Sequence, residues 1–143
     1  MPLRSARSAV GPQVDLKEEG ARLDFLGFTF RYERDRFGRS RRYLNVEPSR
    51  QAVQRERDKL RAMTRRRFCW QPLPDLVVDL NRHLKGWANY FDFGYPRRAF
   101  RRINGYVRAR MAAHLKRRSQ RAFRLPEGLT SYRYLADLGL VLL

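Results

Sequence analysis

The sequence is poor in the residue types that build disulfide frameworks and metal sites. It contains one cysteine, Cys69, and two histidines, His83 and His114. A single thiol excludes an internal disulfide framework, and the spacing of these three residues fits no recognised zinc site. We therefore expect neither a metal ion nor a cofactor.

Long apolar runs are also missing. No stretch approaches the ~20 consecutive apolar residues that cross a bilayer, and nothing near Met1 has the apolar centre of a signal peptide. We therefore expect a cytoplasmic protein that has no membrane partner.

Acidic residues are scarce relative to basic ones. The chain of 143 residues has 14 Asp and Glu against 32 Lys and Arg, which gives a formal net charge of +18, and all but four of the basic residues are arginine. The planar guanidinium group pairs with phosphate through two hydrogen bonds and stacks on bases. The excess therefore favours a nucleic acid as partner. The alternative is that arginine richness reflects genomic base composition and only solvates the surface.

The first third of the chain predicts a leader and a small β structure. Residues 1–13 are rich in Pro, Ser, Gly and Arg without apolar periodicity, which predicts a disordered leader. Large apolar residues alternate from Asp24 to Tyr32, which predicts one strand, and Arg41–Pro48 is its expected partner. Val14–Leu16 is a candidate third strand. We interpret residues 14–47 as a β-hairpin unit.

The rest of the chain, residues 48–143, predicts helices. Ser49 is the expected N-cap of a first helix that runs to about Arg67. Apolar residues at three- and four-residue intervals predict a second helix from about Pro74 to Phe91 and a third from about Pro96 to Arg118. A short helix and an apolar tail then pack back onto the others. The expected fold is mainly α: a three-helix bundle preceded by a short β-hairpin, with a small C-terminal helix.

Basic side chains concentrate at two places on these helices. On the third helix, arginine and lysine stand beside small residues that would let a phosphate backbone come close; the alternative is a solvated face next to a helix packing seam. The run Arg65, Arg66 and Arg67 either compensates the dipole at the end of the first helix or contacts RNA. His114 lies by phase at the edge of the core, which favours a structural role over a ligand role.

Several motifs resemble one protein family. The run NRHLKGWANYFDFG, from Asn81 to Gly94, and the segment PRRAFRRINGYVRARMAAHLKRR after it resemble the core signature of the group II intron maturase-specific domain. GWANYF, Gly86–Phe91, is its most specific part. FLGFTF, Phe25–Phe30, resembles the strand that ends the palm of these reverse transcriptases, and YRYLADLGL, Tyr132–Leu140, resembles the family's closing segment. The resemblance spans roughly residues 14–143.

The resemblance implies a fold and a function. It implies that residues 14–47 are a remnant of the palm end and that residues 48–143 form the maturase-specific helical domain, a thumb-like bundle. It also implies a module that binds group II intron RNA and assists its folding and splicing, while the RNA performs the chemistry. The Tyr-Ala-Asp-Asp motif that holds the two metal ions of the polymerase palm does not occur in the sequence. We therefore expect no catalytic residues and no enzyme activity from this chain alone.

Two alternatives remain open within this resemblance. The chain is either the thumb of a split or truncated reverse transcriptase, completed by a separate palm-containing chain, or a nonfunctional remnant of such an enzyme.

Candidate contact residues follow from charge and helix phase. Gly86 interrupts a good helix at a cost of about 1 kcal/mol relative to alanine, which suggests that something approaches closely there. Trp87 and Phe91 are core residues by phase, whereas their polar neighbours point outward. The expected RNA contacts are Arg65, Arg66, Arg67, Arg82, Lys85, Asn89, Tyr90, Arg97, Arg98, Arg101, Arg102, Arg108, Lys116, Arg117 and Arg118.

Overall fold

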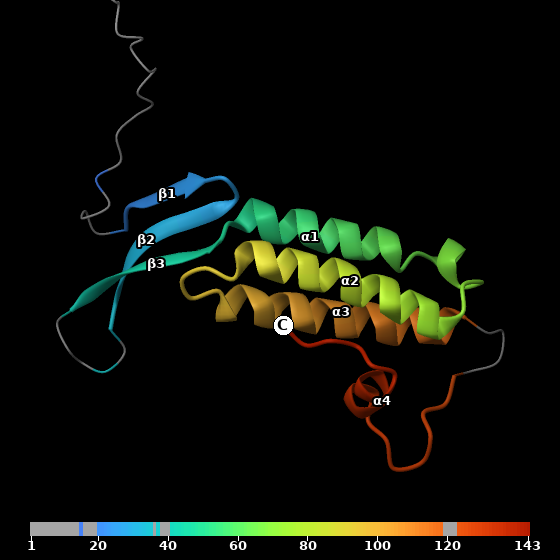
Figure 1. Ribbon diagram of the computed structural model, residues 1–143. Coiled ribbons are helices and arrows are strands. Elements are labelled where there is room, and N and C mark those ends of the chain that lie inside the picture. The colour runs from blue at the N-terminus through green and yellow to red at the C-terminus, as the bar shows by residue number, and fades with distance from the viewer. Residues whose placement is uncertain (1–14, 16–19, 36, 38–40, 119–122) are drawn as a thin grey trace, which may run out of the picture.

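Three long helices lie side by side with a small sheet at one end (Figure 1). The computed structural model describes residue 15, residues 20–35, residue 37, residues 41–118 and residues 123–143. The expected leader and Val14–Leu16 strand lie outside the described residues, apart from Asp15. The elements are β1 (Arg22–Phe25), β2 (Phe28–Arg34), β3 (Arg42–Pro48), α1 (Arg50–Met63), a 3-10 turn η1 (Arg66–Phe68), α2 (Leu73–Phe91), α3 (Arg97–Arg117) and α4 (Ser131–Asp137). The chain is thus mixed: helices, as expected, plus a sheet of three strands.

The prediction of one strand from Asp24 to Tyr32 was wrong. This segment folds back on itself, so that β1 and β2 form an antiparallel hairpin in which Phe25 faces Phe28. Leu26 and Gly27 make the two-residue turn, with φ of 51° and 84°, the signs of a type I′ turn. β3 pairs with β2 as predicted, which gives the sheet order β1-β2-β3.

The sheet is attached to the helices by close contacts at their shared end. Gly94, between α2 and α3, has φ of 68°, and a Cβ there would meet the carbonyl oxygen of Val46 at 2.4 Å, so only glycine fits. The next amide, that of Tyr95, donates to the same oxygen at 3.1 Å. The ring of Phe28 lies 5.0 Å from that of Phe91. These contacts fix the sheet relative to the ends of α2 and α3.

α1 begins as predicted but ends earlier. The Ser49 hydroxyl accepts a hydrogen bond from the Ala52 amide at 3.1 Å, so Ser49 is the N-cap. The helix ends at Met63 and not at Arg67. The Thr64 hydroxyl donates to the Leu60 carbonyl at 2.8 Å, and the backbone then turns into η1. Arg65, Arg66 and Arg67 therefore lie just beyond the last turn of α1, and the basic residue within that turn is Arg61.

The predicted apolar faces of α2 and α3 form one core with α1. Leu60, Leu80, Ile103 and Met111 are completely buried. The expected bounds of α2 and α3 agree with the structure to within one residue. His114 lies deeper than predicted, with 1% of its surface exposed.

The C-terminal segment packs back on the bundle as predicted. Leu135 of α4 is buried, and Leu138, Leu140, Val141 and Leu143 pack against the core. Two asparagines hold this segment, one from each of two helices. The side chain of Asn81 on α2 bonds Gly139 and Val141, and that of Asn104 on α3 bonds both backbone groups of Leu143.

Candidate nucleic-acid interface

The three long helices meet along three seams, and different side chains or segments lie at each seam. The α2–α3 seam is covered, because the C-terminal segment bonds to Asn81 and Asn104 there. At the α1–α2 seam, Glu56 meets the imidazole Nε2 of His83, with its two oxygens at 2.8 and 2.9 Å. Glu56 is 3% exposed, and this burial raises its pKa although His83 acts in the opposite direction. The α1–α3 seam is bridged by Arg110 and Thr64 at one end and contains a strongly basic hollow toward the sheet.

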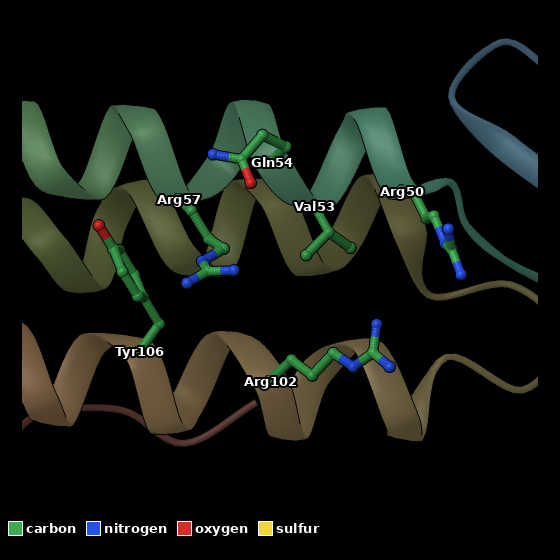
Figure 2. Close-up of a pocket in the computed structure, with 6 residues that line it drawn as sticks. All are labelled: Arg50, Val53, Gln54, Arg57, Arg102 and Tyr106. Carbon is green, nitrogen blue, oxygen red and sulfur yellow. The ribbon is translucent and has the colours of Figure 1, made fainter.

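We call this hollow of the α1–α3 seam the arginine groove, and it has a volume of about 560 Å³. Figure 2 shows the guanidinium groups of Arg50, Arg57 and Arg102 extending into the space between the two helices. Arg50 and Arg57 are seven residues apart, and this spacing places them on one face of α1. Arg102 faces them from α3. The remaining lining residues are Val53, Gln54 and Tyr106.

Tyr106 helps to hold one wall of the arginine groove. The guanidinium carbon of Arg57 lies 4.7 Å from the centre of the Tyr106 ring, a cation–π contact between α1 and α3. By contrast, Arg50 and Arg102 have no acidic partner among the residues that the structure describes. Their positive charge is available to an anion.

The arginine groove continues to the sheet. A pocket of about 150 Å³ shares Arg50, Val53 and Arg102 with it and adds Arg22, Arg31 and Arg98; Glu47 is the acidic residue in its lining. A wider hollow of about 430 Å³ then extends along β2 and β3 to Tyr95, and Arg97 and Arg101 line it. Because neighbouring hollows share lining residues, they form one continuous basic surface at the sheet end of the molecule.

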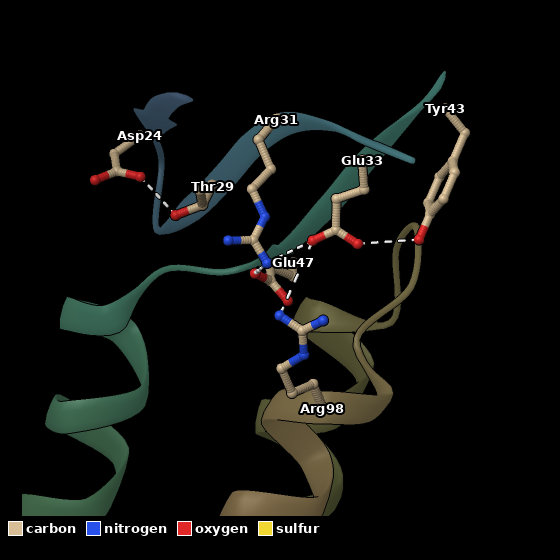
Figure 3. A network of polar contacts seen from close by, with 7 residues as sticks. All are labelled: Asp24, Thr29, Arg31, Glu33, Tyr43, Glu47 and Arg98. Carbon is tan, nitrogen blue, oxygen red and sulfur yellow. Dashed lines mark hydrogen bonds and ion pairs between the residues drawn. The ribbon is translucent and has the colours of Figure 1, made fainter. Parts of the chain in front are cut away.

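An ion-pair network sets part of this surface (Figure 3). Arg31 bridges two carboxylates: its Nη2 contacts Glu33 and also Glu47, the latter at 2.8 Å. The Tyr43 hydroxyl donates to Glu33 at 3.0 Å, and Arg98 approaches the same carboxylate at 3.9 Å. Partial burial raises the pKa of Glu33, but the Tyr43 hydrogen bond and the Arg31 charge outweigh it, so the net pKa is lowered. The charge of Arg31 is therefore neutralised by Glu33 and Glu47, and its role is to hold the sheet face together.

The structure brings some of the predicted contact residues together and separates others. Arg97, Arg98, Arg101 and Arg102 gather at the start of α3, on the basic surface just described. Other predicted residues are exposed along α2: Arg82, Lys85 and Asn89, of which Arg82 lines a hollow between α1 and α2. A third set is exposed at the far end of the helices, where α1 and α3 both end: Arg65, Arg66, Arg67, Lys116 and Arg117.

Three predicted contact residues also hold the fold together. The Arg108 guanidinium lies 4.4 Å from the Tyr132 ring of α4. Arg118 donates to the Gln71 carbonyl and contacts His114. The Tyr90 hydroxyl donates to the Leu26 carbonyl at 3.0 Å, which ties α2 to the hairpin turn. These side chains have partners inside the chain.

Gly86 and Gly105 are exposed and open. A Cβ added at either position meets nothing within 4 Å. Nothing in the described chain therefore accounts for the close approach that we expected at Gly86.

Sequence reasoning missed Arg22, Arg50 and Arg57. The seven-residue spacing of Arg50 and Arg57 around Gln54 was an available signal, because it predicts a basic stripe on α1. The spacing does not predict which neighbouring helix this stripe faces.

Within the described ranges, no three His, Cys, Asp or Glu side chains group as a metal site requires. None of the described helices combines the length and the apolar character needed to cross a membrane.

Comparison with known protein families matches residues 53–127, more than half of the chain, to the model described as "Group II intron, maturase-specific domain". The matched segment contains most of α1 and all of α2 and α3. It therefore includes both walls of the arginine groove apart from Arg50. Comparisons with curated proteins and with solved structures found no match.

Proposed function

Because this chain belongs to the group II intron maturase-specific domain family, we propose that it binds structured group II intron RNA and assists its folding and splicing. A role related to group II intron maturation follows from the family itself. In our proposal the chain contributes binding and no polymerase activity, because the family match covers the maturase-specific domain and the sequence has no Tyr-Ala-Asp-Asp motif.

The arginine groove is the observation that carries the proposal. Helices of folded RNA approach one another only if the charge of their phosphates is neutralised, and a protein supplies this with fixed cations. Arg50 and Arg102 face each other across this groove and have no acidic partner among the described residues. Rigid helices carry both side chains, so they are suited to reading the shape of an RNA backbone and not its base sequence.

Removing the two free charges of the groove tests the proposal. We expect Arg50→Gln with Arg102→Gln to weaken binding to a group II intron transcript by about tenfold or more at low salt, since each lost charge-assisted contact costs ~1 kcal/mol or more. The slope of log K against log salt should become shallower by about 1.4 to 1.8, because each of the two phosphate contacts contributes roughly 0.7 to 0.9. Filter binding or fluorescence anisotropy over a salt series measures both quantities.

A matched control removes the same charge from the other side of α1. Arg55→Gln with Lys59→Gln lies outside the arginine groove, on exposed positions of the same helix. We expect this variant to bind nearly as tightly as the unmodified chain. If the two variants lose equal affinity, the groove is not the binding site.

Specificity is tested with competitors. The proposal predicts that intron RNA competes better than duplex DNA of the same length at moderate salt, because an A-form helix and its 2′-hydroxyls differ from B-DNA in shape and chemistry. If intron RNA and duplex DNA compete equally well, the chain binds as a nonspecific polycation, which contradicts the maturase role.

The exposed edge strand β1 supports a second candidate function. β1 lies at the edge of the sheet, and on it and its turn Leu23, Phe25 and Leu26 are 40%, 60% and 68% exposed. An edge strand with exposed apolar side chains is suited to packing against further protein. This favours the alternative in which the chain completes a reverse transcriptase whose palm is a separate chain. Primer extension that requires both chains would support it, and full binding with no extension would leave the maturase role alone.

A further inference from the structure

The segment Thr64–Gln71 is fastened to α3 at both ends. At its start, the Thr64 carbonyl accepts from the Nδ1 of His114 at 3.2 Å and the Thr64 hydroxyl accepts from Arg110 at 3.0 Å. At its other end, the Gln71 carbonyl accepts from Arg118. The side chain of Gln71 also donates to Asp79 of α2 at 2.9 Å. The segment is therefore a fixed part of the fold.

Its middle is held by backbone hydrogen bonds. The amides of Phe68, Cys69 and Gln71 donate to carbonyls three residues earlier, at 3.0, 3.0 and 3.1 Å. Phe68 is half-buried, and the guanidinium of Arg67 stacks 4.8 Å from its ring centre. These contacts turn the next aromatic residue, Trp70, outward, so that 79% of its surface is exposed.

An exposed aromatic residue alone says little, because single apolar side chains are common on protein surfaces. Trp70 differs in its surroundings. The three arginines before it are exposed, and from Thr64 to Gln71 the sequence contains no acidic residue. Lys116 and Arg117 are exposed at the two positions that precede Arg118, which bonds Gln71. A flat, exposed ring on a fixed backbone, directly after a run of exposed arginines, is suited to stacking on a base while the arginines bind neighbouring phosphates.

We propose that Trp70 stacks on an unpaired nucleobase of the bound RNA, while Arg65, Arg66 and Arg67 bind the phosphates on either side of that nucleotide. This inference rests on the proposed function and adds a second contact site, at the opposite end of the helices from the sheet (Figure 1). Stacking is tolerant of base identity because every base has a π face. The site thus recognises a loop, bulge or single-stranded end and not a particular sequence.

The test compares two RNA hairpins that differ only in an unpaired 3′ extension, using the full chain and fluorescence anisotropy. We expect Trp70→Ala to lose about 5- to 150-fold in affinity for the extended hairpin, the range given by removing one stacked base contact. Binding to the blunt hairpin should change little. Trp70→Phe should retain most of the affinity, because a phenyl ring still stacks. Phe93→Ala is the control, since Phe93 is 63% exposed at the sheet end.

A spectroscopic signal reports the contact itself. In a Trp87→Phe background Trp70 is the remaining tryptophan, and its fluorescence should be quenched by the extended hairpin more than by the blunt one.

Each outcome separates the two proposals. If the unmodified chain binds both hairpins and Trp70→Ala does so equally well, the stacking site is overturned and the arginine groove stands. If the unmodified chain binds neither hairpin nor an intron transcript, the proposed function fails as well. If Trp70→Ala loses binding only to vesicles rich in phosphatidylserine, Trp70 is a lipid contact and the inference is overturned.

Discussion

His114 is a buried histidine whose partners define its protonation state. A backbone carbonyl only accepts, so the Nδ1 of His114 carries the proton that bonds Thr64 at 3.2 Å. Its Nε2 is then an acceptor, and the guanidinium of Arg118 donates to it at 3.1 Å. Burial lowers the pKa of His114, the Thr64 hydrogen bond opposes this, and the positive charges of Arg118, Arg117 and Arg110 lower it further. The folded chain therefore holds this imidazole neutral.

This lowered pKa makes stability depend on pH. Between the lowered folded pKa and the usual value of 6.5, the unfolded chain binds a proton at His114 more fully than the folded chain does, so stability rises with pH in this range. The contribution is complete above about pH 6.5 and is lost as the pH falls toward the folded pKa. We expect the urea midpoint to decrease between pH 7.5 and pH 5.

The variant His114→Asn isolates this effect. It removes the titrating group, so its urea midpoint should vary less with pH over the same range, although it is less stable throughout. Glu56 also titrates, because burial raises its pKa, and the stabilisation that it contributes is lost as the pH rises. Both chains contain Glu56, so its contribution cancels when the two are compared. Equal pH dependence of the two chains would mean that His114 is not the responsible group.

At the scale of elements, the β1–β2 turn requires positive φ at two residues, and only one of them, Gly27, is suited to it. Gly27 adopts φ of 84° without penalty, and a Cβ there would meet the Phe91 ring at 3.3 Å. Leu26 adopts φ of 51°, a left-handed conformation that costs an L residue with a side chain roughly 1 to 2 kcal/mol. Leu26 is also 68% exposed, so its side chain recovers little of this cost through burial.

We therefore predict that Leu26→Asn stabilises the chain. Asn-Gly is the preferred pair for a type I′ turn, and the change should raise the free energy of unfolding by about 0.5 to 1 kcal/mol in urea denaturation. The Leu26 carbonyl, which accepts from Tyr90, is unaffected by the substitution. Gly27→Ala is the opposing control and should destabilise. A stabilising Gly27→Ala would show that the hairpin does not hold this turn in solution.

The same turn shows why part of the fold was not predictable from the sequence. Ser49 as N-cap and the periods of α2 and α3 are local signals, and the structure confirms them. A type I′ turn is recognised by residues that tolerate positive φ, and leucine is not one of them. The alternation of Phe25, Phe28 and Phe30 continued through the turn and suggested a single strand.

The candidate site was predictable only in part for a different reason. Arginine is exposed on every helix of the bundle, so charge alone does not identify one face. The cluster at the start of α3 was found because four basic residues lie within six positions of the sequence. Arg50 and Arg57 matter because α1 packs beside α3, and Arg108 and Arg118 turn toward partners in the fold for the same kind of reason. Such placements depend on tertiary packing.

At the scale of the whole molecule, the net charge of +18 opposes folding and favours binding. Like charges repel more strongly in the compact state than in the extended chain. Salt shortens the range of this repulsion from about 30 Å at 0.01 M to about 10 Å at 0.1 M. The same screening weakens contacts with phosphates. Added salt should therefore stabilise the fold and weaken the RNA complex.

The arginine groove should show both effects of salt, on the stability of the fold and on RNA binding. Arg50 and Arg102 lie across one seam without an acidic partner among the described residues, so in the absence of RNA they repel each other. We predict that Arg50→Gln with Arg102→Gln raises the thermal midpoint in 10 mM salt and that the gain shrinks in 500 mM salt, where the repulsion is already screened. Thermal unfolding followed by circular dichroism at both salt concentrations measures this, with Arg55→Gln and Lys59→Gln as the charge-matched control. A variant that binds RNA less and yet folds more stably at low salt would show that these arginines are retained for the ligand, because a structural role predicts a lower midpoint at both concentrations.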